Sequence, residues 1–250
     1  NVDQKFFYKK KIATDCADVA IAARWIFARI YKLPAAQSLA GSNVLFSNDS
    51  FKEEWANLAT DVNWEEDILF RTALDYVLNN TYTHSLWNDS YPIQIAPESF
   101  LQGTYHLIIR GHTGHTQLVN YFNTQNFELI YSDVPRKIRK LYSVPFAEDM
   151  PIPGKSAFVK MRWPVQTPAG LILKDKNEMP YYSLNQYSEG LEENEIGSYA
   201  FGFLKAINLA PNIKDYFEDA AKNLYYGFSN RIQIVEVGFN FCSMNDCTEG

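Results

Sequence analysis

The sequence predicts an α+β fold, in which an N-terminal helix carrying Cys16 packs on an antiparallel sheet and a mixed helical extension follows. Three observations predict it. Helical spacing of apolar residues dominates the first third of the chain, short β-branched and aromatic runs fill the middle, and helical spacing returns near the end. Helices and strands that are segregated in this way are typical of the α+β class.

The first expected helix runs from Thr14 to Ile30. Thr14 or Asp15 can act as its N-cap, and Leu33-Pro34 ends it. Its apolar residues follow the spacing of a helix with one buried face, at Val19, Ala23, Ile26, Phe27 and Ile30. Cys16 therefore falls in the first helical turn, on the side turned toward the protein.

A second helix is expected after an irregular stretch over residues 35–62, which holds one short helix near Phe51 to Leu58. Asn63 can cap this second helix, and the acidic residues at 65–67 complement its dipole. It should end near Asn79-Asn80. Its apolar stripe comprises Ile68, Leu69, Ala73, Tyr76 and Val77.

The chain then changes to strand character. Short runs rich in β-branched and aromatic residues cover Tyr105 to Ile109, His115 to Tyr121 and Phe127 to Ser132. The second and third runs form a predicted antiparallel hairpin. Further strands are expected at Ala157 to Trp163, Leu171 to Lys174 and Ile232 to Phe239, and a helix pair at Glu193 to Asn208 and Ile213 to Tyr226.

The length of 250 residues allows a substantial core in one domain. We expect residues 1–150 to form the core and residues 151–250 to complete the same domain as a C-terminal extension. A net charge of −6 disfavours nucleic acid as a partner, and no apolar run is long enough for membrane insertion. The glycines form no phosphate-binding loop, so no cofactor is expected.

The three cysteines bear on the compartment. Cys242 and Cys247 lie in a polar, turn-rich segment without the further Cys or His of a zinc set, so a local disulfide is expected and a metal site is not. The chain also begins with Asn rather than Met. Together these features predict a processed protein of the periplasm or the extracellular space, in which Cys16 is the odd thiol.

A thiol at a helix N-terminus can be activated, because unpaired N–H groups and the helix dipole stabilise the thiolate. Asp15 and Asp18 oppose this effect, so an imidazole partner would be needed. His115 opens a strand directly after a glycine turn and is the predicted base. His112, three residues earlier in that turn, is a competitor.

A catalytic imidazole needs a third group that holds its tautomer. If a hairpin starts at His115, its return strand ends beside that residue, which makes Asp133 the predicted orienting group. Asn120 and Asn123 are weaker alternatives further along the hairpin. Asp133 can equally serve the turn before Pro135.

The order of these residues carries a resemblance. A Cys that opens a helix, a His that opens a strand and a polar residue at the end of the next strand resemble the papain-like superfamily of cysteine hydrolases. Asp-Cys-Ala-Asp at 15–18 is similar to the motif of NlpC-type cell-wall peptidases, and the spacing from His115 to Asp133 is similar to that of transglutaminase-like proteins. The motif lacks the Ser-Gly usual after the NlpC cysteine, and Gln117 replaces an aromatic residue common in transglutaminase-like proteins.

The resemblance implies an exported cysteine hydrolase that uses a Cys16-His115-Asp133 triad for acyl transfer on amide bonds, with a peptide or peptidoglycan-like substrate. Asp18, Gln117 and His112 are the expected substrate-binding residues. Asp18 has the alternative role of complementing the helix dipole. The alternative function is a catalytically inactive papain-like protein that binds or scaffolds in the cell envelope, since free Cys is among the most buried residue types.

Overall fold

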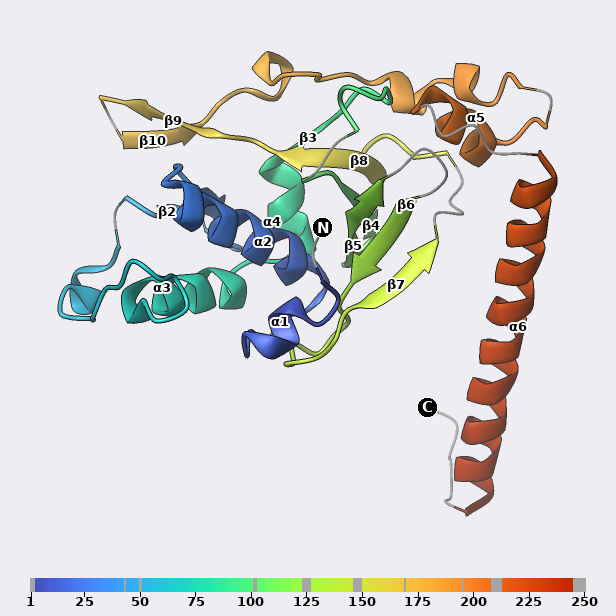
Figure 1. The fold of residues 1–250 in the computed structure, drawn as a ribbon, viewed down its shortest axis with the longest axis horizontal. Coiled ribbons are helices and arrows are strands. Elements are labelled where there is room, and N and C mark those ends of the chain that lie inside the picture. The colour runs from blue at the N-terminus through green and yellow to red at the C-terminus, as the bar shows by residue number, and fades with distance from the viewer. Residues whose placement is uncertain are drawn as a thin grey trace. The chain divides into compact units, whose positions relative to one another are not determined.

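The computed structural model describes residues 3–42, 44–49, 51–100, 103–122, 127–145, 150–168, 170–194, 196–207 and 213–244. The chain forms two compact units, residues 1–209 and residues 210–250. Helix accounts for 37% of the chain and strand for 24%, which agrees with the expected α+β class. Figure 1 shows the arrangement of the elements within the first unit.

A six-stranded antiparallel sheet organises the first unit, with the strand order β3-β8-β4-β5-β6-β7. Its strands are β3 (Ser90–Pro92), β4 (Tyr105–Arg110), β5 (Thr113–Phe122), β6 (Phe127–Tyr131), β7 (Tyr142–Pro145) and β8 (Ser156–Met161). Two small antiparallel pairs are β1 (Ala36–Ser38) with β2 (Leu45–Ser47), and β9 (Pro164–Thr167) with β10 (Gly170–Leu173). The predicted hairpin of the second and third strands is β5 with β6.

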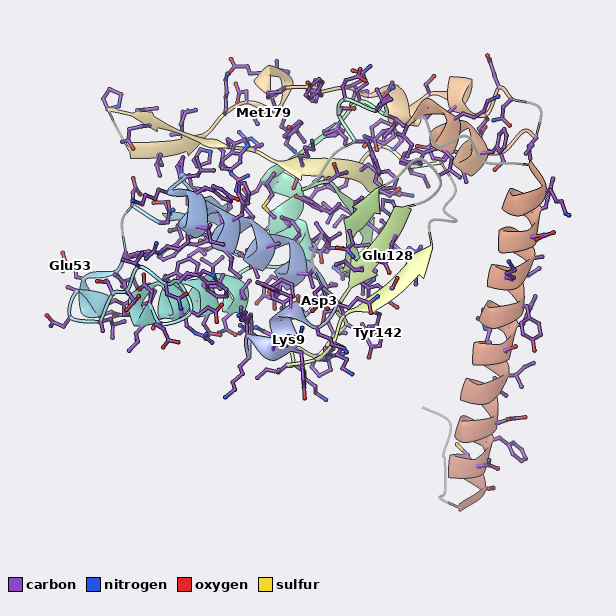
Figure 2. All side chains as sticks on the ribbon, viewed as in Figure 1. Asp3, Lys9, Glu53, Glu128, Tyr142 and Met179 are labelled. Atoms are coloured by element: carbon purple, nitrogen blue, oxygen red, sulfur yellow. The ribbon has the colours of Figure 1, made fainter. Side chains whose placement is uncertain are left out.

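Helices cover one face of this sheet, called here the helix face. They include α1 (Phe6–Lys9), α2 (Cys16–Tyr31), α3 (Ile68–Asn79) and α4 (Thr83–Asn88). Both α2 and α4 contact β5, and Figure 1 shows them on the same side of the sheet. Because strand side chains alternate between faces, Leu107 and Leu118 point into the core with Ile21 and Trp25 of α2. Asp3 and Lys9 at α1, labelled in Figure 2, form an exposed ion pair of 2.7 Å.

The opposite face, called here the cavity face, carries an aromatic cluster. His106 of β4 stacks on Phe158 of β8 with ring centroids 4.7 Å apart. Phe158 also contacts Phe203 of α5 (Tyr199–Ala206) and Phe100. Residues on both sides of position 150 thus belong to one sheet, because β8 lies between β3 and β4 and α5 packs on β8.

Short 3-10 turns complete the first unit, at η1 (Glu53–Trp55), η2 (Lys176–Glu178), η3 (Asn185–Tyr187) and η4 (Glu189–Leu191). The second predicted helix starts later than expected. Asp67, not Asn63, is the N-cap of α3, since its carboxylate accepts the N–H of Phe70 at 2.9 Å. The predicted stripe of α2 is also partly wrong, because Phe27 and Ile30 are exposed while Ile21 and Trp25 are buried.

The second unit contains α6 (Ile213–Met244), a single helix of 32 residues. The strand predicted at Ile232 to Phe239 is wrong, because these residues continue this helix. Cys242 is disulfide-bonded, whereas Cys247 lies outside the described residues. No helix in the described part of the chain is long and apolar enough to cross a membrane.

Candidate functional site

The site is built on an unpaired edge of β5. Strand β6 pairs with β5 only from Leu118 onward, so the stretch Gly114–Gln117 has no β6 partner. Ile109 of β4 stands opposite Gly114 and sends its N–H to Lys155, away from β5. Because hydrogen-bonded pairs alternate in an antiparallel ladder, the carbonyl of Gly114 and the N–H of Thr116 point toward the open edge.

The thiol of Cys16 occupies this edge. Cys16 is the first residue of α2, and the carboxylate of Asp15 caps the helix by accepting the N–H groups of Ala17 and Asp18. The sulfur lies 3.8 Å from the carbonyl oxygen of Gly114, to which the thiol donates, and 3.7 Å from the hydroxyl oxygen of Thr83. The side chain is 6% exposed.

Burial raises the pKa of the Cys16 thiol, and the charge of Asp15 raises it further. Hydrogen bonds to Thr83 and to the backbone of Thr116 and Ala17 oppose the rise, since they favour the thiolate. The balance leaves a protonated thiol at neutral pH. The helix N-terminus therefore does not generate a thiolate by itself in this site.

His115 lies on the same edge but projects from the cavity face. Its ring meets that of Tyr131, the last residue of β6, edge to face at 4.9 Å. Burial lowers the pKa of His115, Asp133 opposes this, and Arg110 adds to it. No hydrogen bond joins the imidazole to the sulfur of Cys16 in the described structure, because the sulfur approaches β5 from the helix face, beside Gly114 and Thr83, whereas the His115 side chain projects from the cavity face.

Asp133 follows the end of β6 and is exposed. Its carboxylate accepts the N–H of Val134 at 2.9 Å and interacts electrostatically with His115. The neighbouring Ser132 donates its hydroxyl to the carbonyl of Thr14 at 2.8 Å, which ties the segment after β6 to the segment before Cys16. The three predicted triad residues thus surround one stretch of β5.

A cavity of about 330 Å³ opens on the cavity face beside His115. Its lining consists of Ile108, Arg110, Thr113, Gly114, His115 and Gln117. Gln117 is buried, and its Oε1 lies 3.5 Å from Nδ1 of His106. The Gln117 side chain therefore lines the cavity. Its role in substrate binding stays a prediction.

Asp18 requires a correction, because its carboxylate is fully buried and cannot face a substrate. It accepts the N–H of Asp15 at 2.9 Å and lies 3.2 Å from Nε of Arg136. Burial raises the pKa of Asp18 to about 7, and the charge of Asp15 adds to the rise. An acidic residue at position 18 is explained by the capping box, in which the carboxylate of Asp18 accepts the backbone N–H of the N-cap residue Asp15.

His112 lies exposed in the two-residue turn between β4 and β5 and does not line the cavity. Asn120 donates to Glu128 of β6, which is labelled in Figure 2, at 2.9 Å. Asn120 is therefore committed to another partner. Asn123 lies outside the described residues.

Sequence reasoning missed two residues of the site. Thr83 contacts the sulfur from α4, a short helix that the sequence patterns do not predict. Arg110 ends β4 and reaches the cavity because a two-residue turn returns the chain at once. The glycine turn signal could have located Arg110 opposite Thr113, whereas no local signal places Thr83.

Comparison with family models, with curated proteins and with solved structures finds no match to this chain. No group of three or more potential metal ligands occurs among the described residues. The function is therefore inferred from the residues of the chain itself.

Proposed function

We propose that this protein is a cysteine-dependent hydrolase or acyltransferase acting on peptide amides, with Cys16 as nucleophile, His115 as base and Asp133 as orienting group. One observation carries the proposal: the sulfur of Cys16 rests on the carbonyl of Gly114, the residue directly before His115. Nucleophile and base thus lie next to the same open edge of β5, on opposite sides of the strand. The papain-like resemblance supports the same assignment.

The protonation states support general-base catalysis rather than a preformed ion pair. The pKa of the thiol is raised and that of His115 is lowered, so the thiol is protonated and the imidazole neutral near pH 7. In the proposed reaction the imidazole must leave Tyr131 and move around the open edge of β5, because the sulfur lies on the other side of the strand, before it can accept the thiol proton. The sulfur then forms a bond to the amide carbonyl carbon.

The same imidazole returns the proton to the leaving amine as the carbon–nitrogen bond breaks. Water, or an amine in the transferase variant, then attacks the thioester and releases Cys16. The N–H of Thr116 points to the sulfur from the open edge. It would donate to the oxyanion beside the attacking sulfur.

The first test uses p-nitrophenyl acetate as a general acylating probe. We expect acetylation of Cys16, seen by mass spectrometry, and loss of this adduct in Cys16→Ala. His115→Gln should slow acetylation about 100-fold, while the matched variant His84→Gln should not. Equal acetylation rates in His115→Gln and the unmodified protein would overturn the assignment of His115 as the base. A strong decrease of the rate in His112→Gln would identify His112 as the base instead.

The second test identifies the reaction. Purified cell-wall peptides report hydrolysis, and a glutamine peptide with an amine donor reports amide exchange. Release of new amino termini supports the hydrolase, and incorporation of the amine supports the transferase. If Cys16 is acetylated by the probe but the protein converts neither the cell-wall peptides nor the glutamine peptide, the proposal is restricted to other amides.

A second candidate function is ligand binding without catalysis in the cell envelope. The buried, protonated thiol without an imidazole contact favours it. In that case Cys16 would remain unacetylated by the probe until the protein unfolds. The Cys16→Ala variant would then retain the full biological effect of the unmodified protein.

A further inference from the structure

The cavity beside His115 is lined by the cationic side chain of Arg110. Arg110 is exposed at the end of β4, and within the described residues its guanidinium forms no ion pair. The charge nevertheless reaches His115, whose pKa it lowers. A guanidinium is a rigid fork that matches the two oxygens of a carboxylate.

The remaining lining complements such a ligand. Ile108 provides an apolar part of the lining, while the hydroxyl of Thr113 donates to the carbonyl of Arg110 at 2.9 Å and thereby closes the turn from which Arg110 projects. The Oε1 of Gln117 faces His106, which leaves its Nε2 as a donor. A volume of about 330 Å³ accommodates a carboxylate together with one small residue of a peptide.

We propose that this cavity binds a carboxylate through Arg110. Gly114 lines the cavity and also accepts the Cys16 thiol, so under the proposed function the substrate is a peptide whose free carboxylate lies across the open edge of β5 from the amide that is cleaved. As a statement about substrate, the inference rests on the proposed function. As a statement about binding, it can be tested without catalysis. A carboxylate with one negative charge fits better than a doubly charged phosphate. The negative charge of Asp133 already acts on His115 and would repel the second charge of the phosphate.

Binding at Arg110 would also tune the base. The groups that act on His115 are Arg110 of β4, Asp133 after β6, Tyr131 of β6 and the coupled imidazole of His106. A bound carboxylate neutralises the one cation among them that lowers the pKa of His115. The pKa of His115 therefore rises when the ligand binds, and the ligand binds more tightly when His115 is protonated.

The test compares N-acetylglycine with N-acetylglycinamide, which differ in charge but hardly in size, and uses inorganic phosphate as a third probe. Binding is measured on the full chain carrying Cys16→Ala, so that no turnover occurs. We expect N-acetylglycine to bind more tightly than the amide and than phosphate. Its affinity should fall about tenfold in Arg110→Gln and remain unchanged in Arg231→Gln, a matched exposed arginine on α6.

The second readout is the imidazole resonance of His115, assigned through His115→Asn. N-acetylglycine should move its titration midpoint upward, and Arg110→Gln should move the midpoint of the free protein upward as well. Equal binding of acid and amide, or unchanged binding in Arg110→Gln, would overturn the carboxylate site. Preferred binding of phosphate would replace the carboxylate by a phosphate ligand.

These outcomes are separate from the fate of the proposed function. If the protein binds N-acetylglycine through Arg110 but Cys16 is never acetylated, the carboxylate site stands and the hydrolase proposal is wrong. If Cys16 is acetylated but N-acetylglycine and N-acetylglycinamide bind equally well, the hydrolase proposal stands and the carboxylate site is wrong.

Discussion

The hydroxyl oxygen of Thr83 lies 3.7 Å from the sulfur of Cys16. Because the thiol donates to Gly114, the hydroxyl donates to the sulfur, and this hydrogen bond lowers the pKa of a thiol that burial raises. A residue on α4 thus controls the ionisation of a residue at the start of α2.

Replacement Thr83→Val should raise the pKa of Cys16 further, since valine keeps the shape of threonine but cannot donate. The measurement is the rate of iodoacetamide alkylation as a function of pH. We expect the profile to move to higher pH and the rate at pH 8 to fall several-fold. Thr81→Val is the matched control, because Thr81 is equally buried but bonds to Val77. An unchanged profile in Thr83→Val would show that the contact does not act on the thiolate.

Gly114 is required by the close approach of Thr83 to β5. A Cβ at position 114 would lie 2.6 Å from Cγ2 of Thr83 and 2.9 Å from the carbonyl oxygen of Ile108. Gly114→Ala should therefore lower the free energy of unfolding by about 1–3 kcal/mol, measured by urea denaturation. The double variant Gly114→Ala/Thr83→Ser should recover part of this loss, because serine lacks Cγ2. Additive losses would contradict steric conflict with Thr83.

The parts of the fold that the sequence predicts well are those with local causes. The start of α2 follows from Asp15, whose carboxylate has no competing role, and β4 to β6 follow from alternating apolar runs between turns. Other stretches have a pattern that fits two structures, and the sequence does not decide between them. β-branched residues in Ile232 to Phe239 suggested a strand, but Ile232, Val235 and Phe239 also have helical spacing, and the long helix α6 continues through them.

The candidate site was predictable in composition but not in geometry. The chain order of Cys16, His115 and Asp133 predicts that they lie near one hairpin; in the structure Cys16 contacts Gly114, and the charge of Asp133 acts on His115, while the triad stays a prediction. The sequence could not show that Cys16 would pack against Gly114, and therefore on the side of β5 opposite the His115 side chain, because that depends on how α2 docks on the sheet. Nor could it show that Asp18 would be buried against Arg136, which is 118 positions away.

Asp18 should make stability depend on pH. Its pKa in the folded protein, about 7, lies above the ordinary value of 3.8, so folding favours the protonated carboxyl. The stabilisation is therefore present below about pH 4 and is lost as pH rises through 7. Asp18→Asn mimics the protonated form, and its amide oxygen can still accept the N–H of Asp15.

We expect Asp18→Asn to match the unmodified protein near pH 4 and to exceed its free energy of unfolding by about 2–4 kcal/mol at pH 8. Denaturation curves at several pH values measure this difference. Asp75→Asn is the control, because Asp75 also pairs with Arg136 but is largely exposed. If Asp18→Asn were instead less stable at pH 8, the ion pair with Arg136 would outweigh the cost of burial.

Gln186 should be among the polar residues on which stability depends most. Its side chain is fully buried, with Oε1 accepting the N–H of Phe158 at 2.7 Å and Nε2 donating to the carbonyls of Ile93 and Phe158 at 3.1 and 3.0 Å. Gln186→Leu fills the space but removes the partner of the Phe158 N–H and of the Ile93 carbonyl, while the Phe158 carbonyl still accepts the N–H of Ile93 at 3.2 Å, so the free energy of unfolding should fall by about 3 kcal/mol. The exposed Gln166→Leu should change it by less than about 0.5 kcal/mol. Similar losses in the two variants would mean that the amide of Gln186 is replaceable by water, and the segment it holds against β8 would then be anchored by apolar packing alone.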